Sequence, residues 1–241
     1  MIDGKPRPVR AGNRSAPRRA VPARRIGRVP AAIPVVSDAI AMRDWLIERI
    51  SPLERAYLAQ REPWQQSGFS GPQERWDACR RPIAECMDQP GTFLDIGCAN
   101  GYLLECVVGW KLRQGVAIDP FGLDIGEKLA ALARKRLPEQ AGNIFVGNAW
   151  DWRPPRQFDY VRTELGYAPP LLQRRYVTRL MAECVAADGR LLVAEYRSGK
   201  NPYHTPWIDD TLRRWGFDVA LIASGLWQGQ ELTRVAVIVK R

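Results

Sequence analysis

The segment Phe93-Leu-Asp-Ile-Gly-Cys-Ala-Asn-Gly101 decides the fold of this chain of 241 residues. It begins with apolar residues around Asp95, as in a buried strand that ends at the edge of a sheet. Gly97 then permits a tight turn and a close approach of the backbone to a ligand. A helical pattern begins at Tyr102. Doubly wound sheets bind ligands at the carboxyl ends of such strands. We therefore expect this turn to be part of a ligand site.

The sequence on both sides of this segment alternates in the same way. From residue 92 onward, short apolar runs alternate with amphipathic stretches, which is typical of a parallel sheet covered by helices on both faces. The expected strands are 92–96, 121–125, 143–146, 158–163, 190–195, 218–224 and 234–240. The expected helices are 102–110, 127–137, 171–185 and 207–215. No helix separates the last two strands, so they should form an antiparallel hairpin. The fold class is α/β: a Rossmann-like, doubly wound, mostly parallel seven-stranded sheet with an antiparallel C-terminal hairpin.

The chain before this region divides into two parts. Residues 1–34 hold nine basic residues against one acidic residue and show no hydrophobic periodicity, so we expect a disordered basic tail. The net charge of the whole chain is +10, which leaves only +2 for the remainder. Residues 35–90 show helical patterns around a loop at 63–71, with Pro72 as the first residue of a third helix, and should form a helical cap or lid on the domain at 91–241.

The composition argues against several classes of protein. A near-neutral domain behind a basic tail disfavours a nucleic-acid-binding face, with the tail alone as the alternative binding arm. No apolar run approaches the roughly 18 residues of a membrane span, and no signal-peptide core follows the paired arginines, so we expect a cytoplasmic protein without a membrane partner. Five cysteines without Cys-x-x-Cys spacing and a single histidine predict free thiols and no metal site.

The loop after the first strand resembles the first motif of the class I S-adenosylmethionine (SAM) dependent methyltransferases, in which an acid opens a Gly-x-Gly-x-Gly loop. The resemblance implies that Gly97 and Gly101 line the methionine part of SAM and that Asp95 holds either the loop or the amino group. Ala99 replaces the middle glycine, and alanine is the least disruptive replacement provided that its φ is negative. The candidate cofactor residues of this loop are Asp95, Gly97, Cys98, Ala99, Asn100 and Gly101.

Two carboxylates compete for the family's second motif, an acid that ends the second strand and accepts hydrogen bonds from the ribose hydroxyls. We prefer Asp124, followed by Ile125, because a strong helix pattern begins directly after it, at Glu127. Asp119 precedes Pro120 and a longer gap before any helix, and we interpret it as a turn residue.

The segment Val146-Gly-Asn-Ala-Trp150 resembles the third motif, which contacts the adenine. Asn148 offers a donor and an acceptor that suit the adenine edge, and Ala149 follows it. Trp150 is a candidate to stack on the adenine ring, with an ordinary core or surface tryptophan as the alternative.

The segment 158–165 resembles the fourth strand of the family, and its end at Glu164 should face both cofactor and acceptor. No Asn/Asp-Pro-Pro-aromatic motif and no Pro-Cys nucleophile is present, which disfavours methylation of DNA adenine or cytosine C5. His204, the only histidine, lies in the loop after the fifth strand, and its ordinary pKa would suit a general base. A solvent-exposed loop histidine is the alternative. The candidate catalytic residues are Glu164 and His204, with Glu195, Tyr167 and Tyr196 as further groups whose roles are at least equally structural.

Phe69, in the loop at 63–71, is a candidate lid residue. In small-molecule members of the family, an N-terminal segment often folds over the SAM site, and aromatic faces attract a sulfonium. Trp64 and Trp76 are similarly placed, and ordinary packing of the cap on the sheet is the alternative for all three.

Taken with its resemblance, the sequence predicts a SAM-dependent methyltransferase that acts on a small molecule. The alternative is an RNA methyltransferase that uses the basic tail as an electrostatic arm. A SAM-binding protein without activity is a third hypothesis. A nicotinamide-dependent enzyme is disfavoured, because the loop lacks Gly-x-Gly-x-x-Gly spacing.

Overall fold

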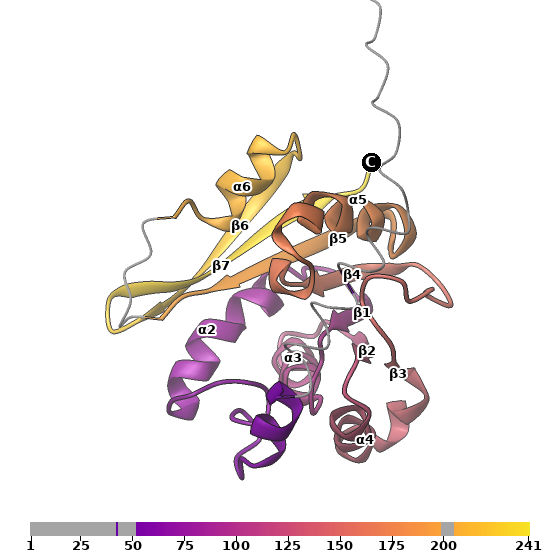
Figure 1. The fold of residues 1–241 in the computed structure, drawn as a ribbon, viewed down its shortest axis with the longest axis vertical. Helices are drawn as coiled ribbons and strands as arrows, with labels where there is room; N and C mark the ends of the chain where they lie inside the picture. Colours follow the sequence, from indigo (N-terminus) through magenta and orange to yellow (C-terminus); the bar gives the residue numbers. More distant parts are fainter. Residues whose placement is uncertain (1–41, 43–51, 199–204) are drawn as a thin grey trace, which may run out of the picture. The chain divides into compact units, whose positions relative to one another are not determined.

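A computed structural model of the chain, which describes residue 42, residues 52–198 and residues 205–241, contains one seven-stranded sheet (Figure 1). The strands are β1 (Gly91–Ile96), β2 (Ile118–Asp124), β3 (Ile144–Val146), β4 (Phe158–Thr163), β5 (Val185–Tyr196), β6 (Val219–Trp227) and β7 (Gln230–Val239). Their spatial order is β3-β2-β1-β4-β5-β7-β6. The strands β1 to β5 are parallel, and β7 is antiparallel to both β5 and β6. The predicted fold class is confirmed, including its C-terminal hairpin.

Helices cover both faces of the sheet. They are α2 (Gln73–Glu85), α3 (Tyr102–Leu112), α4 (Glu127–Arg136), α5 (Gln173–Glu183) and α6 (Ile208–Arg214). In Figure 1, α2, α3 and α4 lie on one side of the sheet, and α5 and α6 lie on the other. Successive side chains of a strand point to opposite faces, so Phe93 joins the apolar cluster under the first group of helices and Leu94 joins the cluster under the second.

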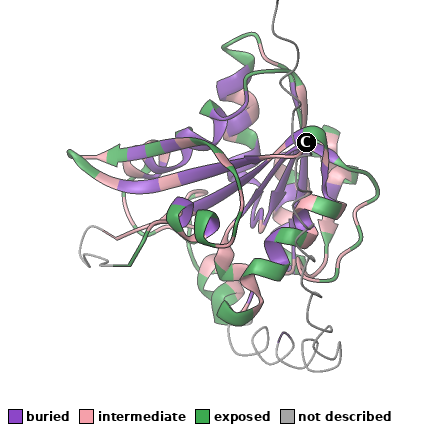
Figure 2. Ribbon diagram, turned by 90° about the horizontal axis from the view of Figure 1, so that it is seen from above, coloured by how far each residue is buried: buried purple, intermediate pink, exposed green. Residues whose placement is uncertain are grey.

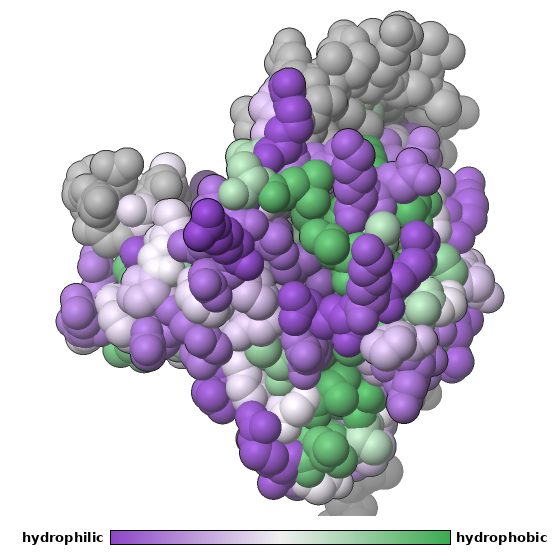
Figure 3. Space-filling view, turned by 90° about the horizontal axis from the view of Figure 1, so that it is seen from below, coloured by the Kyte–Doolittle hydropathy of each residue, from purple (hydrophilic) through white to green (hydrophobic). Residues whose placement is uncertain are grey.

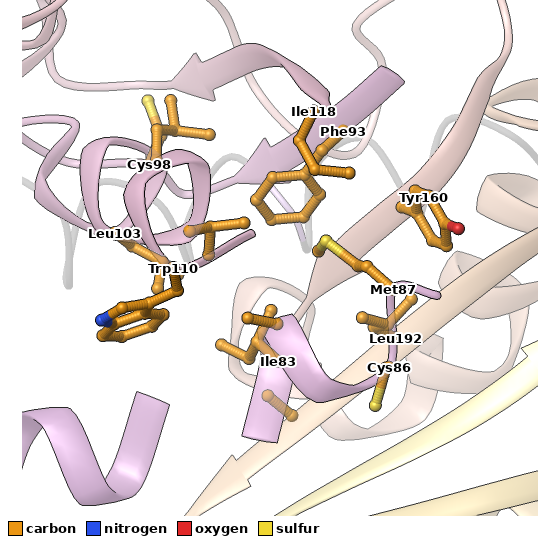
Figure 4. Close-up of a cluster of buried hydrophobic side chains, with 14 of the residues drawn as sticks. Ile83, Cys86, Met87, Phe93, Cys98, Leu103, Trp110, Ile118, Tyr160 and Leu192 are labelled. Atoms are coloured by element: carbon orange, nitrogen blue, oxygen red, sulfur yellow. The ribbon is translucent and has the colours of Figure 1, made fainter. Parts of the chain in front are cut away.

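The two clusters bury the strands almost completely. Figure 2 shows that the central strands are mostly buried, whereas the helices expose their outer sides. Figure 4 shows the first cluster, where Ile83 of α2 and Trp110 of α3 approach Phe93 of β1 and Leu192 of β5. The sheet is therefore a rigid base that holds the loops at its carboxyl edge in place.

Three strands, β2, β5 and β7, begin at least three residues earlier than the sequence pattern predicts. β2 begins at Ile118, so the interpretation of Asp119 as a turn residue is wrong. Proline has no backbone N–H to donate, but this costs β2 no hydrogen bond to β3, because β3 pairs with β2 only from Gly122 onward. Pro120 is therefore tolerated inside the strand. β5 begins at Val185, directly after α5, and its pairing with β4 shifts in register at this end. Turn-forming residues in this stretch concealed the start of the strand.

The N-terminal region is described in part. Residues 52–58 are helical, and residues 61–72 are irregular, in agreement with the expected loop. α2 begins at Gln73, with Pro72 as its N-cap and not as its first residue. The basic tail (1–34) and nearly all of the first expected helix lie outside the described residues, so the division into three domains stays a prediction.

Polar residues dominate the surface shown in Figure 3, with smaller apolar patches between them. None of the helices among the described residues combines the length and apolar character needed to cross a membrane. The five cysteines are free thiols in the structure.

Candidate functional site

A cavity of about 620 Å³ lies at the carboxyl edge of the sheet. One part of its lining comes from the segments that follow β1, β2, β3 and β4 and from the end of β5. Another part comes from residues 52–58, the loop before α2, and α2 itself. This volume lies within the range of about 300–1000 Å³ that small-molecule sites occupy. The lining includes Glu54, Tyr57, Gly68, Phe69, Arg75, Arg80, Asp95, Gly97, Cys98, Ala99, Asp124, Ile125, Gly126, Asn148, Ala149, Arg162, Glu164, Tyr167 and Tyr196.

The loop after β1 turns sharply at Gly97. Its φ is +76°, and a Cβ at this position would overlap the phenol end of Tyr167. The N–H groups of Gly97 and Cys98 donate to the carbonyl oxygen of Leu123 at 2.7 and 3.1 Å, which ties the loop to β2. Position 97 therefore requires glycine for its conformation and for space.

The negative φ expected for Ala99 is not found, because this residue has a φ of +47°. A left-handed conformation costs an L-residue about 1–2 kcal/mol, so the alanine is not the undemanding replacement that the sequence suggested. Its N–H donates to Oδ2 of Asp124 at 2.7 Å, a bond that helps to hold this conformation.

Gly101 and Asn100, which the sequence also predicts as cofactor residues, do not line the cavity, and their contact with a cofactor stays a prediction. A Cβ on Gly101 would lie 2.9 Å from Cβ of Ala133, so this glycine allows α3 to begin close to α4. The fully buried side chain of Asn100 donates to the carbonyl oxygen of Pro63 at 3.0 Å and accepts the N–H of Tyr102 at 3.2 Å. Both residues hold neighbouring segments together.

The two candidate acids of β2 lie at opposite ends of the strand. Asp124 ends the strand and lines the cavity, whereas Asp119 is exposed near its beginning and does not. Oδ1 of Asp124 accepts the N–H of Gly126 at 2.7 Å, and Oδ2 accepts the N–H of Ala99. A carboxylate has about four lone-pair sites, so each oxygen keeps one for a further donor. Burial raises the pKa of Asp124, and these backbone hydrogen bonds oppose the rise.

The segment after β3 brings Asn148 and Ala149 to the cavity but directs Trp150 elsewhere. Oδ1 of Asn148 accepts the N–H of Trp150 at 3.0 Å, while its Nδ2 makes no hydrogen bond to a described residue. Trp150 packs against the apolar cluster under α5 and α6. Trp150 does not line the cavity, and its stacking on an adenine stays a prediction beside the alternative of a packing residue.

Arg162 of β4 connects two acids at the edge of the cavity. Its buried Nη1 donates to Oδ1 of Asp95 at 3.1 Å and to Oη of Tyr167 at 3.3 Å. Its Nη2 donates to Oε1 of Glu164 and, at 3.1 Å, to Oη of Tyr196. Burial raises the pKa of Asp95 to about 6, against the opposing effect of Arg162. Asp95 thus ties β1 to β4, and its role toward a cofactor stays a prediction.

Of the two candidate catalytic residues, Glu164 and His204, Glu164 is the one that the structure describes, and it lines the cavity. Its side chain is 31% exposed. Its Oε1 accepts from Arg162 and, at 3.2 Å, from Oη of Tyr167, whereas Oε2 has no hydrogen bond to a described residue. The carboxylate is therefore oriented and keeps one oxygen for a proton from an acceptor.

The other candidate groups divide between the cavity and its surroundings. Tyr167 and Tyr196 line the cavity, and burial raises the pKa of both phenols. Glu195 does not line it and pairs with Arg197 at 2.7 Å. His204 lies outside the described residues.

The three aromatic residues proposed for a lid have different positions. Phe69 lines the cavity, and its ring centroid lies 5.4 Å from the guanidinium of Arg75 and 5.7 Å from that of Arg80. Trp76 is fully buried and packs against Tyr102 with 4.6 Å between ring centroids, although it also borders the cavity. Trp64 donates to the carbonyl oxygen of Gly71 at 3.0 Å and does not line the cavity. Packing describes Trp64, whereas Trp76 combines packing with a place at the cavity, and the lid role stays a prediction.

Sequence reasoning missed Tyr57, Arg75 and Arg80. A signal for Arg80 was present, because it lies four residues after Trp76 and three before Ile83, both fully buried. This spacing places a cation on the apolar face of α2. Such a residue is rarely buried unless something pairs with it.

Comparisons with known proteins identify the fold. No protein-family model matches the chain, and no curated protein matches it. Among solved structures, it is similar to a 1,6-didemethyltoxoflavin-N1-methyltransferase from Burkholderia thailandensis, bound to that compound and S-adenosylhomocysteine (SAH); the TM-score is 0.54, with 16% identity over 88% of this chain and 92% of that one. It is also similar to a magnesium protoporphyrin IX methyltransferase from Synechocystis, bound to SAM; the TM-score is 0.51, with 19% identity over 88% of this chain and 100% of that one.

A third similar structure is a [4+2]-cyclase, with a TM-score of 0.50 and 15% identity over 85% of this chain and 96% of that one. At these identities the likeness concerns the fold, and the cyclase shows that one fold supports more than one reaction. The chain therefore has the class I fold of the SAM-dependent methyltransferases.

Proposed function

We propose that this chain binds SAM in the cavity and transfers its methyl group to a small molecule. One observation carries the proposal: the loop at 95–99, Asp124 and Asn148 come from three different strand ends and line the same cavity. Two of the similar structures hold SAM or SAH, which supports the choice of cofactor.

The residues present fit this cofactor. Asp124 keeps one lone pair on each oxygen, which suits the two ribose hydroxyls. Nδ2 of Asn148 is a donor that suits an adenine nitrogen. Gly97, Cys98 and Ala99 bring the backbone of their loop to the lining of the same cavity. When bound, SAM supplies a methyl carbon that is activated by a sulfonium.

Methyl transfer requires two functions from the chain. The chain must hold an acceptor lone pair in line with the methyl carbon, and it must receive the acceptor's proton if an N–H or O–H is methylated. Oε2 of Glu164 is positioned for the second task, because Arg162 and Tyr167 hold its other oxygen. Glu164 would then receive the proton that a methylated N–H or O–H group loses.

A small-molecule acceptor follows from the covering of the cavity. The helical residues 52–58, the loop before α2 and α2 all contribute side chains to its lining. The names of two similar enzymes specify small-molecule acceptors, a toxoflavin precursor and a porphyrin. The alternative of an RNA acceptor depends on residues 1–34, so no described residue supports it.

Calorimetric titration with SAH tests the proposal through two matched variants. Asp124→Asn removes the charge that faces the cavity, and Asp119→Asn makes the same change at the exposed end of the same strand. We expect Asp124→Asn to weaken SAH binding by about tenfold or more, since hydrogen bonds to charged groups contribute about 1.5–3 kcal/mol. Asp119→Asn should bind like the wild type. Equal affinities for all three proteins, or no binding by the wild type, would contradict the proposal.

A further inference from the structure

Arg80 of α2 is a buried cation with no ionic partner among the described residues. Only 9% of the residue is exposed, and its buried Nη1 has no hydrogen-bond partner in the described part of the chain. Its guanidinium stacks on Tyr196, 3.5 Å from the ring centroid, and Phe69 lies near it at 5.7 Å. Two aromatic rings therefore hold the group in position without neutralising its charge.

This arrangement differs from that of the neighbouring buried arginine. Arg162 is also enclosed, but Asp95 and Glu164 neutralise its charge. A buried charge is costly unless it is paired and hydrogen-bonded. Arg80 thus lacks the compensation that Arg162 has, which points to a partner from outside the described chain.

Three arginines that line the cavity each have a buried nitrogen without a hydrogen-bond partner among the residues that the structure describes. In the described residues, five buried side-chain polar atoms lack a hydrogen-bond partner, and three of them belong to Arg75 (Nε), Arg80 (Nη1) and Arg162 (Nε). All three arginines line the cavity of the proposed function. Buried polar groups in native proteins almost always have partners, so these three side chains hold unused hydrogen-bonding capacity beside the cavity.

We propose that Arg80 binds a carboxylate of the methyl acceptor, an inference that rests on the proposed function. The planar guanidinium matches a carboxylate with two parallel hydrogen bonds. The aromatic faces of Phe69 and Tyr196 beside it suit an apolar or aromatic body on the same molecule. The acceptor class is therefore a small carboxylic acid.

The position of Arg80 separates it from the ribose end of the cofactor site. Arg80 stacks on Tyr196, which ends β5, whereas Asp124 ends β2. The strand order β2-β1-β4-β5 puts these ends three strands apart, which is about 14 Å at the usual spacing. SAM itself carries a carboxylate on its methionine part, and the experiment must distinguish this second source.

The first arm of the test compares two cofactor analogues. SAH has the amino-acid part, and 5′-methylthioadenosine lacks it. Calorimetry with both analogues is carried out on the wild type, Arg80→Met and the control Arg81→Met. Arg81 is the next residue of α2, is exposed, lies over the Trp110 ring at 4.7 Å and does not line the cavity. We expect both variants to bind both analogues within about twofold of the wild type. A loss of SAH affinity in Arg80→Met with unchanged methylthioadenosine affinity would assign Arg80 to the cofactor and overturn the proposal.

The second arm uses benzoate and its uncharged analogue benzamide, added to each protein with and without saturating SAH and followed by ligand-observed NMR. We expect benzoate to bind the wild type and Arg81→Met more tightly than benzamide, and Arg80→Met to lose at least about tenfold in benzoate affinity. Equal binding of the acid and the amide by the wild type, or unchanged benzoate binding by Arg80→Met, would overturn the proposal. If SAH fails to bind the wild type, the proposed function fails, while the benzoate titration without SAH still tests the anion subsite.

Discussion

Replacement of Gly97 by alanine should destabilise the protein through two separate effects. The φ of +76° costs an L-residue about 1–2 kcal/mol, of which about 0.4–1 kcal/mol is returned because alanine restricts the unfolded chain. In addition, the new Cβ would overlap Oη and Cζ of Tyr167. Overpacking of this kind typically costs about 1–3 kcal/mol.

Gly115→Ala is the matched control. Gly115 has nearly the same φ, +75°, but a Cβ there would have no atom within 4 Å. It should therefore show the conformational effect alone. The expected difference between the two variants is the overpacking cost, about 1–3 kcal/mol. For a chain of this size, 1 kcal/mol changes Tm by about 2–4 °C, so Gly97→Ala should melt about 2–12 °C below Gly115→Ala.

Thermal and urea unfolding followed by circular dichroism measure this difference directly. Gly97→Ala should also bind SAH more weakly, because Tyr167 or the loop must move, whereas Gly115→Ala should not. If the two variants have the same stability, Tyr167 does not pack against Gly97, and the described geometry of the loop is wrong.

Three further predictions concern the charged side chains of Asp95, Arg162 and Glu164. Because burial raises the pKa of Asp95 to about 6, the folded chain holds this proton more tightly than the unfolded chain. The unfolding free energy of the wild type relative to Asp95→Asn should therefore fall as the pH rises from about 4 to about 6, and urea titrations that show a rise would refute this. Arg162→Met should cost about 3–5 kcal/mol in urea unfolding near neutral pH because it leaves Asp95 without its partner, and a loss below about 1 kcal/mol would contradict the described pairing. With a metabolite extract as the acceptor source, Glu164→Gln should slow the formation of SAH from SAM by about a hundredfold or more. The control Glu231→Gln should keep the wild-type rate, because the Glu231 carboxylate pairs with Arg234 away from the cavity. Equal rates for the two variants would exclude Glu164 as the base.

The sequence predicts the sheet and the choice of Asp124 over Asp119 because both leave local signals. Strands buried on both faces appear as apolar runs, and amphipathic helices separate them. Asp124 is distinguished from Asp119 by the helix that follows it directly, and the structure places these acids at opposite ends of β2.

The remaining features depend on packing between distant segments. Gly101 and Gly97 look equivalent in the motif, but one lies against α4 and the other against Tyr167. Trp150 packs against the apolar cluster under α5 and α6, and most residues of that cluster lie far from it in the sequence. The spacing of Arg80 places its charge on the apolar face of α2, but its stacking on Tyr196 of β5 is visible only in the folded chain. None of these contacts is encoded in neighbouring residues.

A crystal structure with SAH bound tests the central claim most directly. The account predicts SAH in the cavity, with its ribose hydroxyls within hydrogen-bonding distance of Asp124 and its adenine beside Asn148. SAH bound elsewhere, or with its ribose away from Asp124, would contradict the account.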